Sequence, residues 1–241
     1  EGRGGRDRLA RSASKSLVTP FRFPASAHNG VVRNREDLVR AVAVKGVRDP
    51  RVLSALREVP RANFVPPDLA ERAYLDGPLP IPHEQVTTQP SLVAMMVEAL
   101  GLTGSERVLE IGAGYGWQTA LLARLCGTVW SVERWPDIAE AARTNLARHG
   151  TTNAEVVVGD GTEGLPEHAP YEAIIVAAAF TRVPPPLAEQ LAPGGRLVQP
   201  MGPGGEEEVA LFEKVRRGLT RRRTIAGAHF VRLYGTHGFP G

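Results

Sequence analysis

The chain contains 241 residues, of which 42% are hydrophobic and 23% charged, and its formal net charge is +3. This composition is typical of one globular domain with room for a small appendage, and so small a charge does not by itself indicate a nucleic-acid partner. The sequence has no apolar run long enough to span a membrane, and its one cysteine, Cys126, excludes a disulfide framework and a cysteine-based metal site.

Cys126 and the histidines give two further expectations. Cys126 lies at the end of an apolar helical run, so we predict a buried structural thiol, and a single reduced cysteine favours a cytoplasmic protein. The histidines show no spacing typical of metal ligands, so we expect no metal.

Residues 1–33 differ from the rest of the chain. Arginines alternate there with Gly, Ser and Ala without a helical or strand period. We therefore predict a disordered or loosely attached basic tail. A transit peptide is the alternative, although Asp7 and the lack of an amphipathic face argue against it.

Residues 34–100 are expected to form N-terminal helices and a ligand-binding loop. Apolar spacing predicts helices over 36–45 and 50–59, the second beginning after Asp49 with Pro50 at its first position. A short helix is expected over 70–75. The polar, proline-rich segment 76–90 shows no period of its own, and such a loop before a helix at 91–100 is a natural binding site. In the alternative interpretation, Thr87 and Thr88 only cap that helix.

Residues 101–241 are expected to form a cofactor-binding sheet, which begins with a strand, a glycine turn and a helix. The strand spans 107–111, glycines follow at 112, 114 and 116, and a second strand at 129–133 ends in Glu133. Glycines allow a sharp turn and the close approach of a ligand, and Glu133 can accept hydrogen bonds from two ribose hydroxyls. Trp117 replaces the third glycine of a dinucleotide fingerprint, and no Lys-Ser/Thr follows, which excludes a P-loop.

The rest of the sheet is predicted from shorter patterns. We expect a helix over 136–148, a strand over 155–158 followed by Asp160, a strand over 171–177, a helix over 184–191 and a strand over 195–199. Two final strands are expected over 208–215 and 224–233. The strongly basic link 216–223 between them is interpreted as a solvated turn.

The acid before the glycines, in Glu-x-Gly-x-Gly-x-Gly, is similar to the motif of S-adenosylmethionine-dependent methyltransferases, whose cofactor carries a positive sulfonium that Glu110 suits. Several stretches in order then resemble the protein-L-isoaspartate (D-aspartate) O-methyltransferase family between about residues 34 and 233. They are 59–66, 73–76, 79–81, 108–114, 158–161, 174–179 and 190–197. The resemblance implies an α/β, Rossmann-like methyltransferase fold with a mostly parallel sheet, helices on both faces and an antiparallel C-terminal edge.

The resemblance also implies a reaction and a set of site residues. A methyl group passes from S-adenosyl-L-methionine, leaving S-adenosyl-L-homocysteine, to an isoaspartyl carboxylate of a protein or peptide, and the ester collapses to a succinimide in a repair pathway. The implied cofactor residues are Glu110, Gly112, Ala113, Gly114, Glu133, Asp160 and Gly161, with Asp160 binding the adenine amino group. The implied substrate residues are Gln85, Val86 and Ala178, and Thr88 positions the substrate carboxylate. A carboxylate is already ionised at neutral pH, so the absence of a general base from this set is expected.

The loop at 82–88 departs from the family pattern. Pro82 and Glu84 replace glycines, Val86 and Thr87 replace threonine and isoleucine, and further on Arg232 replaces a proline. Glu84 would disfavour an acidic substrate unless it points away. A dedicated peptide aspartyl O-methyltransferase that installs an aspartimide in a natural-product precursor is therefore an alternative.

A protein that binds the cofactor or a damaged peptide without turnover is a second alternative, from a different class. The expected partners are isoaspartyl- or aspartyl-containing peptides and proteins, without nucleic acid or membrane, and we expect a monomer. Base-flipping motifs of nucleic-acid methyltransferases are missing from the sequence.

Overall fold

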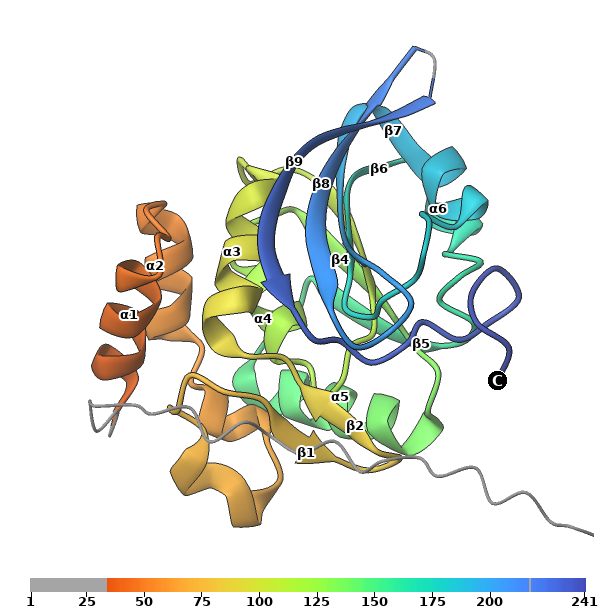
Figure 1. Ribbon diagram of the computed structural model, residues 1–241. Coiled ribbons are helices and arrows are strands. Elements are labelled where there is room, and N and C mark those ends of the chain that lie inside the picture. The colour runs from red at the N-terminus through yellow and green to blue at the C-terminus, as the bar shows by residue number, and fades with distance from the viewer. Residues whose placement is uncertain (1–33, 217) are drawn as a thin grey trace, which may run out of the picture. The chain divides into compact units, whose positions relative to one another are not determined.

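A seven-stranded sheet organises the protein, with strand order β5-β4-β3-β6-β7-β8-β9 (Figure 1). The computed structural model describes residues 34–216 and 218–241, so the predicted basic tail lies outside the described residues. The strands are β3 (Arg107–Ile111), β4 (Thr128–Glu133), β5 (Ala154–Val158), β6 (Tyr171–Val176), β7 (Leu191–Met201), β8 (Glu207–Val215) and β9 (Gly218–Ala228).

The five strands from β3 to β7 are parallel, and β8 is antiparallel to both of its neighbours. β3 lies at the centre, paired with β4 and β6, and its successive residues Val108 and Leu109 are fully buried in different hydrophobic clusters. A strand covered on both faces needs such a continuous apolar run. The predicted parallel sheet with an antiparallel C-terminal edge is confirmed.

Helices cover both faces of the sheet, as the sequence predicts. They are α1 (Arg35–Val44), α2 (Pro50–Glu58), α3 (Pro90–Leu100), α4 (Trp117–Ala123), α5 (Pro136–His149) and α6 (Pro185–Gln190), with short 3-10 helices at Arg61–Phe64, Pro67–Arg72 and Pro166–His168. Buried residues of α1 to α5 share one hydrophobic cluster with one face of the sheet, whereas Leu187 of α6 and Leu233, which follows β9, belong to the cluster on the other face. The predicted start of α2 is confirmed, since the Asp49 side chain accepts a hydrogen bond from the N–H of Arg51.

In the N-terminal half of the chain, two predicted segments differ from the structure. Residues 76–90 include a small antiparallel hairpin, in which β1 (Leu79–Ile81) pairs with β2 (Gln85–Thr87). Strands of three residues with a proline are too short to show a period. The predicted helix over 70–75 is shifted, because the structure has a 3-10 helix over Pro67–Arg72 and residues 73–75 lie beyond its end.

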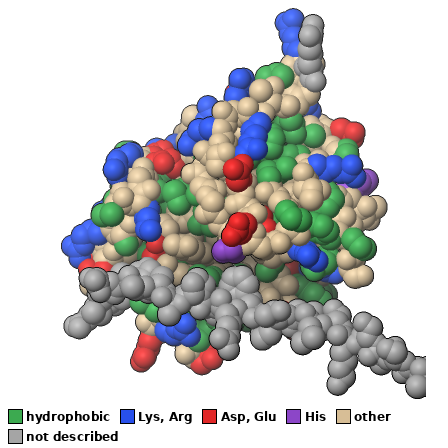
Figure 2. Space-filling view, in the orientation of Figure 1, with side chains coloured by type: hydrophobic (Ala, Val, Ile, Leu, Met, Phe, Trp, Pro, Cys, Tyr) green, Lys and Arg blue, Asp and Glu red, His purple; other side chains and the backbone are tan. Residues whose placement is uncertain are grey.

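The predicted turn at 216–223 is wrong for most of its length. β9 begins at Gly218, so Arg221 and Arg222 are strand residues that form ion pairs with Glu208 and Glu213 of β8. Opposite charges on neighbouring strands stabilise the pairing, and Figure 2 shows Lys and Arg side chains gathered over this hairpin. β9 ends at Ala228 rather than at residue 233. The residues beyond it turn back to the centre of the sheet, where Ala179 donates to the carbonyl of Val231.

Candidate active site

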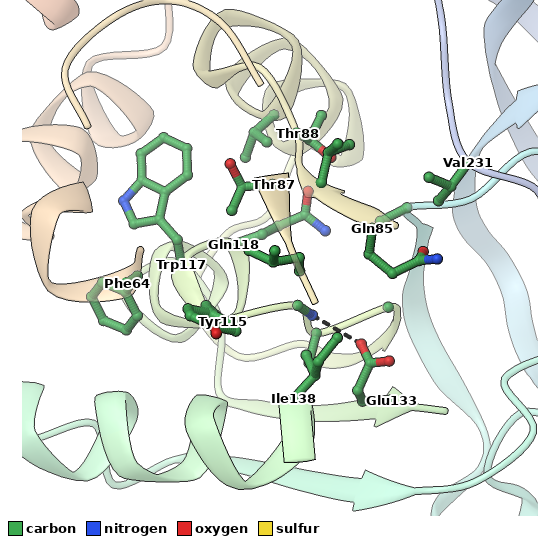
Figure 3. A pocket seen from close by; sticks show the side chains of 17 residues that line it. Phe64, Gln85, Thr87, Thr88, Tyr115, Trp117, Gln118, Glu133, Ile138 and Val231 are labelled. Atoms are coloured by element: carbon green, nitrogen blue, oxygen red, sulfur yellow. Dashed lines mark hydrogen bonds between the residues drawn. The ribbon is translucent and has the colours of Figure 1, made fainter. Parts of the chain in front are cut away.

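A cleft lies between the β1–β2 hairpin and the glycine turn that follows β3 (Figure 3). It is at the carboxyl ends of the parallel strands, where ligands bind in folds of this type. Its walls are formed by Phe64, Ile81, Gln85, Val86, Thr87, Thr88, Val93, Gly112, Ala113, Gly114, Tyr115, Trp117, Gln118, Glu133, Ile138, Ala177 and Val231. Seven of the predicted site residues are therefore brought together: Gln85, Val86, Thr88, Gly112, Ala113, Gly114 and Glu133.

The glycine turn needs its glycines for conformation. Gly112 and Gly114 have φ angles of 93° and 53°, which residues with a side chain rarely adopt. The turn can therefore bring backbone directly against a ligand.

Glu133 faces the glycine turn from the end of β4. Its Oε2 accepts a hydrogen bond of 3.0 Å from the N–H of Gly114, and its Oε1 accepts one of 3.2 Å from Trp135 (Figure 3). Burial raises the pKa of Glu133, against the effect of these backbone donors. A carboxylate has about four acceptor positions, so each oxygen can still accept a hydrogen bond from a diol such as ribose.

Glu110 lies beneath the wall of the cleft rather than on it. Its carboxylate is fully buried and accepts hydrogen bonds from Gln118 Nε2 at 2.9 Å and Thr119 Oγ1 at 2.5 Å. Burial raises the pKa of Glu110 to about 7. Glu110 therefore does not line the cleft, whereas Gln118, which donates to it, does, because the helix after the glycine turn covers the acid.

Asp160 and Gly161 also lie outside the walls of the cleft. Asp160 Oδ1 accepts from the N–H and the hydroxyl of Thr162, at 2.8 and 2.7 Å, and Oδ2 accepts from the N–H of Thr236 at 2.6 Å. Burial opposes ionisation, but these hydrogen bonds lower the pKa of Asp160. Gly161 is required by packing, since a Cβ there would lie 2.4 Å from Cγ2 of Ile111.

A buried arginine, Arg61, holds the end of the hairpin next to α3, and it was not among the predicted site residues. Arg61 is 1% exposed and donates to Thr87 Oγ1 at 2.7 Å and to the Thr88 carbonyl at 3.2 Å. Its other acceptors are the carbonyls of Ala73, Leu75 and Gly77. Burial lowers the pKa of Arg61 to about 9, so it remains charged at neutral pH. The guanidinium therefore positions the backbone on which Thr88 stands.

Thr87 and Thr88 do not cap α3, so the alternative interpretation of these residues is wrong. The N-cap residue is Gln89, and the N–H of Ser91 donates to Asp76 Oδ1 at 2.8 Å. The Thr87 hydroxyl accepts a hydrogen bond from Arg61. The Thr88 side chain lines the cleft instead and forms no hydrogen bond within the described part of the chain.

Other wall residues differ from the prediction. Ala178 does not line the cleft, but its neighbour Ala177 does, because successive residues after a strand face different ways. The walls also contain residues that were not among the predicted site residues: Phe64, Tyr115, Trp117, Gln118, Ile138 and Val231. Tyr115, Trp117 and Gln118 adjoin the glycine turn and could have been found from that position, whereas Phe64 and Val231 come from distant segments.

The described residues also bear on metal binding and on membrane crossing. Within 34–216 and 218–241, no group of three or more His, Cys, Asp or Glu side chains could hold a metal ion. In that part of the chain, no helix is both long enough and apolar enough to cross a membrane.

The parallel sheet, the glycine turn and the acid at the end of the neighbouring strand define a Rossmann-like methyltransferase of the S-adenosylmethionine-dependent class. The family model "Protein-L-isoaspartate(D-aspartate) O-methyltransferase (PCMT)" matches residues 33–238. The chain therefore belongs to the protein-L-isoaspartate(D-aspartate) O-methyltransferase family, and the resemblance found in the sequence is confirmed.

Individual proteins agree with this assignment. Protein-L-isoaspartate O-methyltransferase of Methanoculleus marisnigri is 50% identical over 210 residues, 87% of this chain and 95% of that protein. The protein of the same name from Anaeromyxobacter dehalogenans is 51% identical over 190 residues, 78% of this chain and 91% of that protein. A solved protein-L-isoaspartate O-methyltransferase is 32% identical, with a TM-score of 0.75 over 85% of this chain and 67% of that chain. A Plasmodium falciparum structure in complex with S-adenosyl-L-homocysteine has a TM-score of 0.71 over 83% of this chain and 98% of that chain, at 21% identity, and shows the shared fold.

Proposed function

We propose that this cleft carries out the reaction of its family, the transfer of a methyl group from S-adenosyl-L-methionine to the carboxylate of L-isoaspartyl residues. One observation carries the assignment of residues: the Thr88 hydroxyl stands without a hydrogen-bond partner among the described residues, in the same cleft as Glu133 and the glycine turn. A hydroxyl in that position can donate to a substrate carboxylate.

The residues of the cleft fit the cofactor. When bound, S-adenosyl-L-methionine would supply a methyl group activated by the positively charged sulfur that carries it. Glu133 has acceptor positions left for the ribose, Gly112 and Gly114 leave space where a side chain would intrude, and Gln118 offers its carbonyl oxygen since its amide nitrogen is bonded to Glu110. We propose that Asp160 recognises adenine with its remaining acceptor positions, and that Gly161 acts by packing.

The chain then has three tasks in the reaction. Thr88 orients the carboxylate, which is already ionised and needs no general base. Val86 and Trp117 exclude water from the cleft and so strengthen polar interactions inside it. Arg61 holds the Thr88 backbone in place. The methyl ester then collapses to a succinimide, which hydrolyses in part to aspartate.

Two peptides and two variants test this proposal. The peptides differ only in carrying isoaspartate or aspartate, and the gain of a methyl group and the later loss of methanol are followed by mass. Thr88→Ser keeps the hydroxyl and should retain activity, whereas Thr88→Val should lower kcat/KM by roughly tenfold or more because it removes one hydrogen bond to a charged group. Binding of S-adenosyl-L-homocysteine, measured by calorimetry, serves as the control and should not change. Equal activity of the two variants would refute the role of Thr88.

One observation favours a second candidate, a dedicated peptide aspartyl O-methyltransferase. Glu84 is exposed at the hairpin tip with a φ of 57°, at a position where the family usually has glycine. Methylation of the aspartyl peptide alone would support this candidate. Cofactor binding without methylation of either peptide would instead support the non-catalytic alternative.

We further propose a cytoplasmic monomer without nucleic-acid or membrane partners. Its support is the small net charge and the single, buried cysteine. Light scattering at micromolar concentration tests the oligomeric state, and a dimer mass would refute this part of the proposal.

A further inference from the structure

The tip of the β1–β2 hairpin touches the beginning of α5. The His83 ring stacks on the Trp135 indole, with ring centroids 4.0 Å apart and planes inclined by 6°. Its Nε2 lies 2.9 Å from both carboxylate oxygens of Asp137. We call these interactions the tip contact. The hairpin belongs to the substrate side of the cleft, whereas Trp135 and Asp137 follow Glu133 in the chain.

The hairpin depends on contacts from outside itself. It pairs only three residues on each strand, and hairpins of this size are marginal alone. His83 and Glu84 at its tip have φ angles of 59° and 57°, a conformation that is unfavourable for residues other than glycine. Arg61 fixes the far end of the hairpin, near Thr87 and Thr88. The tip itself is held by His83.

The tip contact connects the two groups of residues on which the proposed function rests. Gln85 Nε2 donates to the His83 carbonyl at 2.9 Å, and Gln85 lines the cleft. On the opposite side, the N–H of Trp135 donates to Glu133 Oε1. A movement of the tip would therefore be transmitted both to the substrate residues and to the surroundings of Glu133.

We propose that His83 is a positioning residue that keeps the hairpin closed over the cofactor cleft, and that the stack on Trp135 limits the rate at which S-adenosyl-L-homocysteine leaves. This inference rests on the proposed function. The stack is the main component, because the side chains of His83 and Asp137 are 35% and 58% exposed and exposed ion pairs contribute little.

Four variants separate the components. His83→Ala removes the whole tip contact, His83→Phe keeps an aromatic ring, and Asp137→Asn keeps the stack but loses the charge. Glu84→Gly is the matched control, since it changes the neighbouring tip residue of the same unusual conformation and leaves His83 in place. Dissociation of S-adenosyl-L-homocysteine is measured by stopped-flow displacement without any peptide, and the KM for the cofactor and kcat are measured with the isoaspartyl peptide.

His83→Ala should release S-adenosyl-L-homocysteine roughly tenfold faster and raise the KM for the cofactor, with kcat at saturation and the melting temperature close to those of the original protein. His83→Phe should restore both constants to within about threefold, and Asp137→Asn and Glu84→Gly should stay within that range. Unchanged release from His83→Ala, or failure of phenylalanine to rescue it, would overturn the proposal.

A second measurement does not need ligand or catalysis. Hydrogen exchange of residues 79–88 should accelerate in His83→Ala, and also in Trp135→Leu, which breaks the stack from the other side. Unchanged exchange in both variants would overturn the closure even if methyl transfer were intact. Failure of the original protein to methylate the isoaspartyl peptide would instead refute the proposed function.

Discussion

The buried carboxyl of Glu110 makes stability depend on pH in a way that one substitution can isolate. Glu110 is fully buried, and burial raises its pKa from an ordinary value of 4.5 to about 7. The folded protein therefore holds a proton on Glu110 at pH values where the unfolded chain has already released it. As pH rises through this window, the folded state loses stability relative to the unfolded state.

The size of the effect follows from the shift. The change in pKa from 4.5 to about 7 corresponds to roughly 3 kcal/mol of stability, most of which is lost between pH 5 and pH 8. The glutamine of Glu110→Gln cannot ionise, so the free energy of unfolding of this variant does not fall with rising pH for this reason. Any cost of rearranging the hydrogen bonds to Gln118 and Thr119 is independent of pH.

Urea unfolding of both proteins at pH 5, 6, 7 and 8 provides the assay. The free energy of unfolding of Glu110→Gln minus that of the original protein should rise by roughly 2–3 kcal/mol across this range, whatever its starting value. Glu106→Gln is the control. Burial disfavours the charged form of Glu106, but hydrogen bonds from Thr103 and Gly104 lower its pKa below the ordinary value. The stability that ionised Glu106 contributes is therefore lost only at acid pH, outside the range of this assay. A flat difference for Glu110→Gln would refute the reasoning.

Two further predictions concern packing and thiol reactivity. Gly161→Ala should lower the free energy of unfolding by about 1–3 kcal/mol, because its Cβ would lie 2.4 Å from Ile111, while Gly77→Ala, with no atom within 4 Å of its Cβ, should stay within about 0.5 kcal/mol. Equal urea midpoints for the two would contradict the packing argument. Burial raises the pKa of Cys126 to about 12, so the native protein at pH 8 should react with a disulfide reagent far more slowly than the urea-unfolded chain. Equal reaction rates in the two states, followed by absorbance, would show that the thiol is accessible.

Local patterns account for the parts of the site that the sequence predicts well. β3, the glycine turn, α4 and β4 follow one another within 27 residues, from Arg107 to Glu133. Each carries its own signal: a continuous apolar run, glycines at positive φ, and an acid at the end of a strand. The same holds for α2, whose start is set by Asp49 and Pro50.

Short or distant interactions account for the rest. The hairpin strands have three residues each, so their pairing is decided by contacts with other segments rather than by a period. The arginines of β9 carry a composition typical of a solvated turn, but cross-strand ion pairs make them strand residues. Neither the pairing of β1 with β2 nor the strand at 218–228 can be predicted from the local sequence alone.

The sequence by itself determined the class of fold, because repeated hydrophobic periods and a glycine turn specify it locally, and its resemblance over about residues 34–233 indicated the family. Only the tertiary structure decided which side chains line the cleft. In the structure, Glu110 lies behind Gln118 and accepts a hydrogen bond from it. Thr87 accepts a hydrogen bond from Arg61, whereas Thr88 lines the cleft, and the His83 ring stacks on Trp135. These choices depend on packing between segments far apart in the chain, where burial and the satisfaction of hydrogen bonds decide the orientation of each side chain.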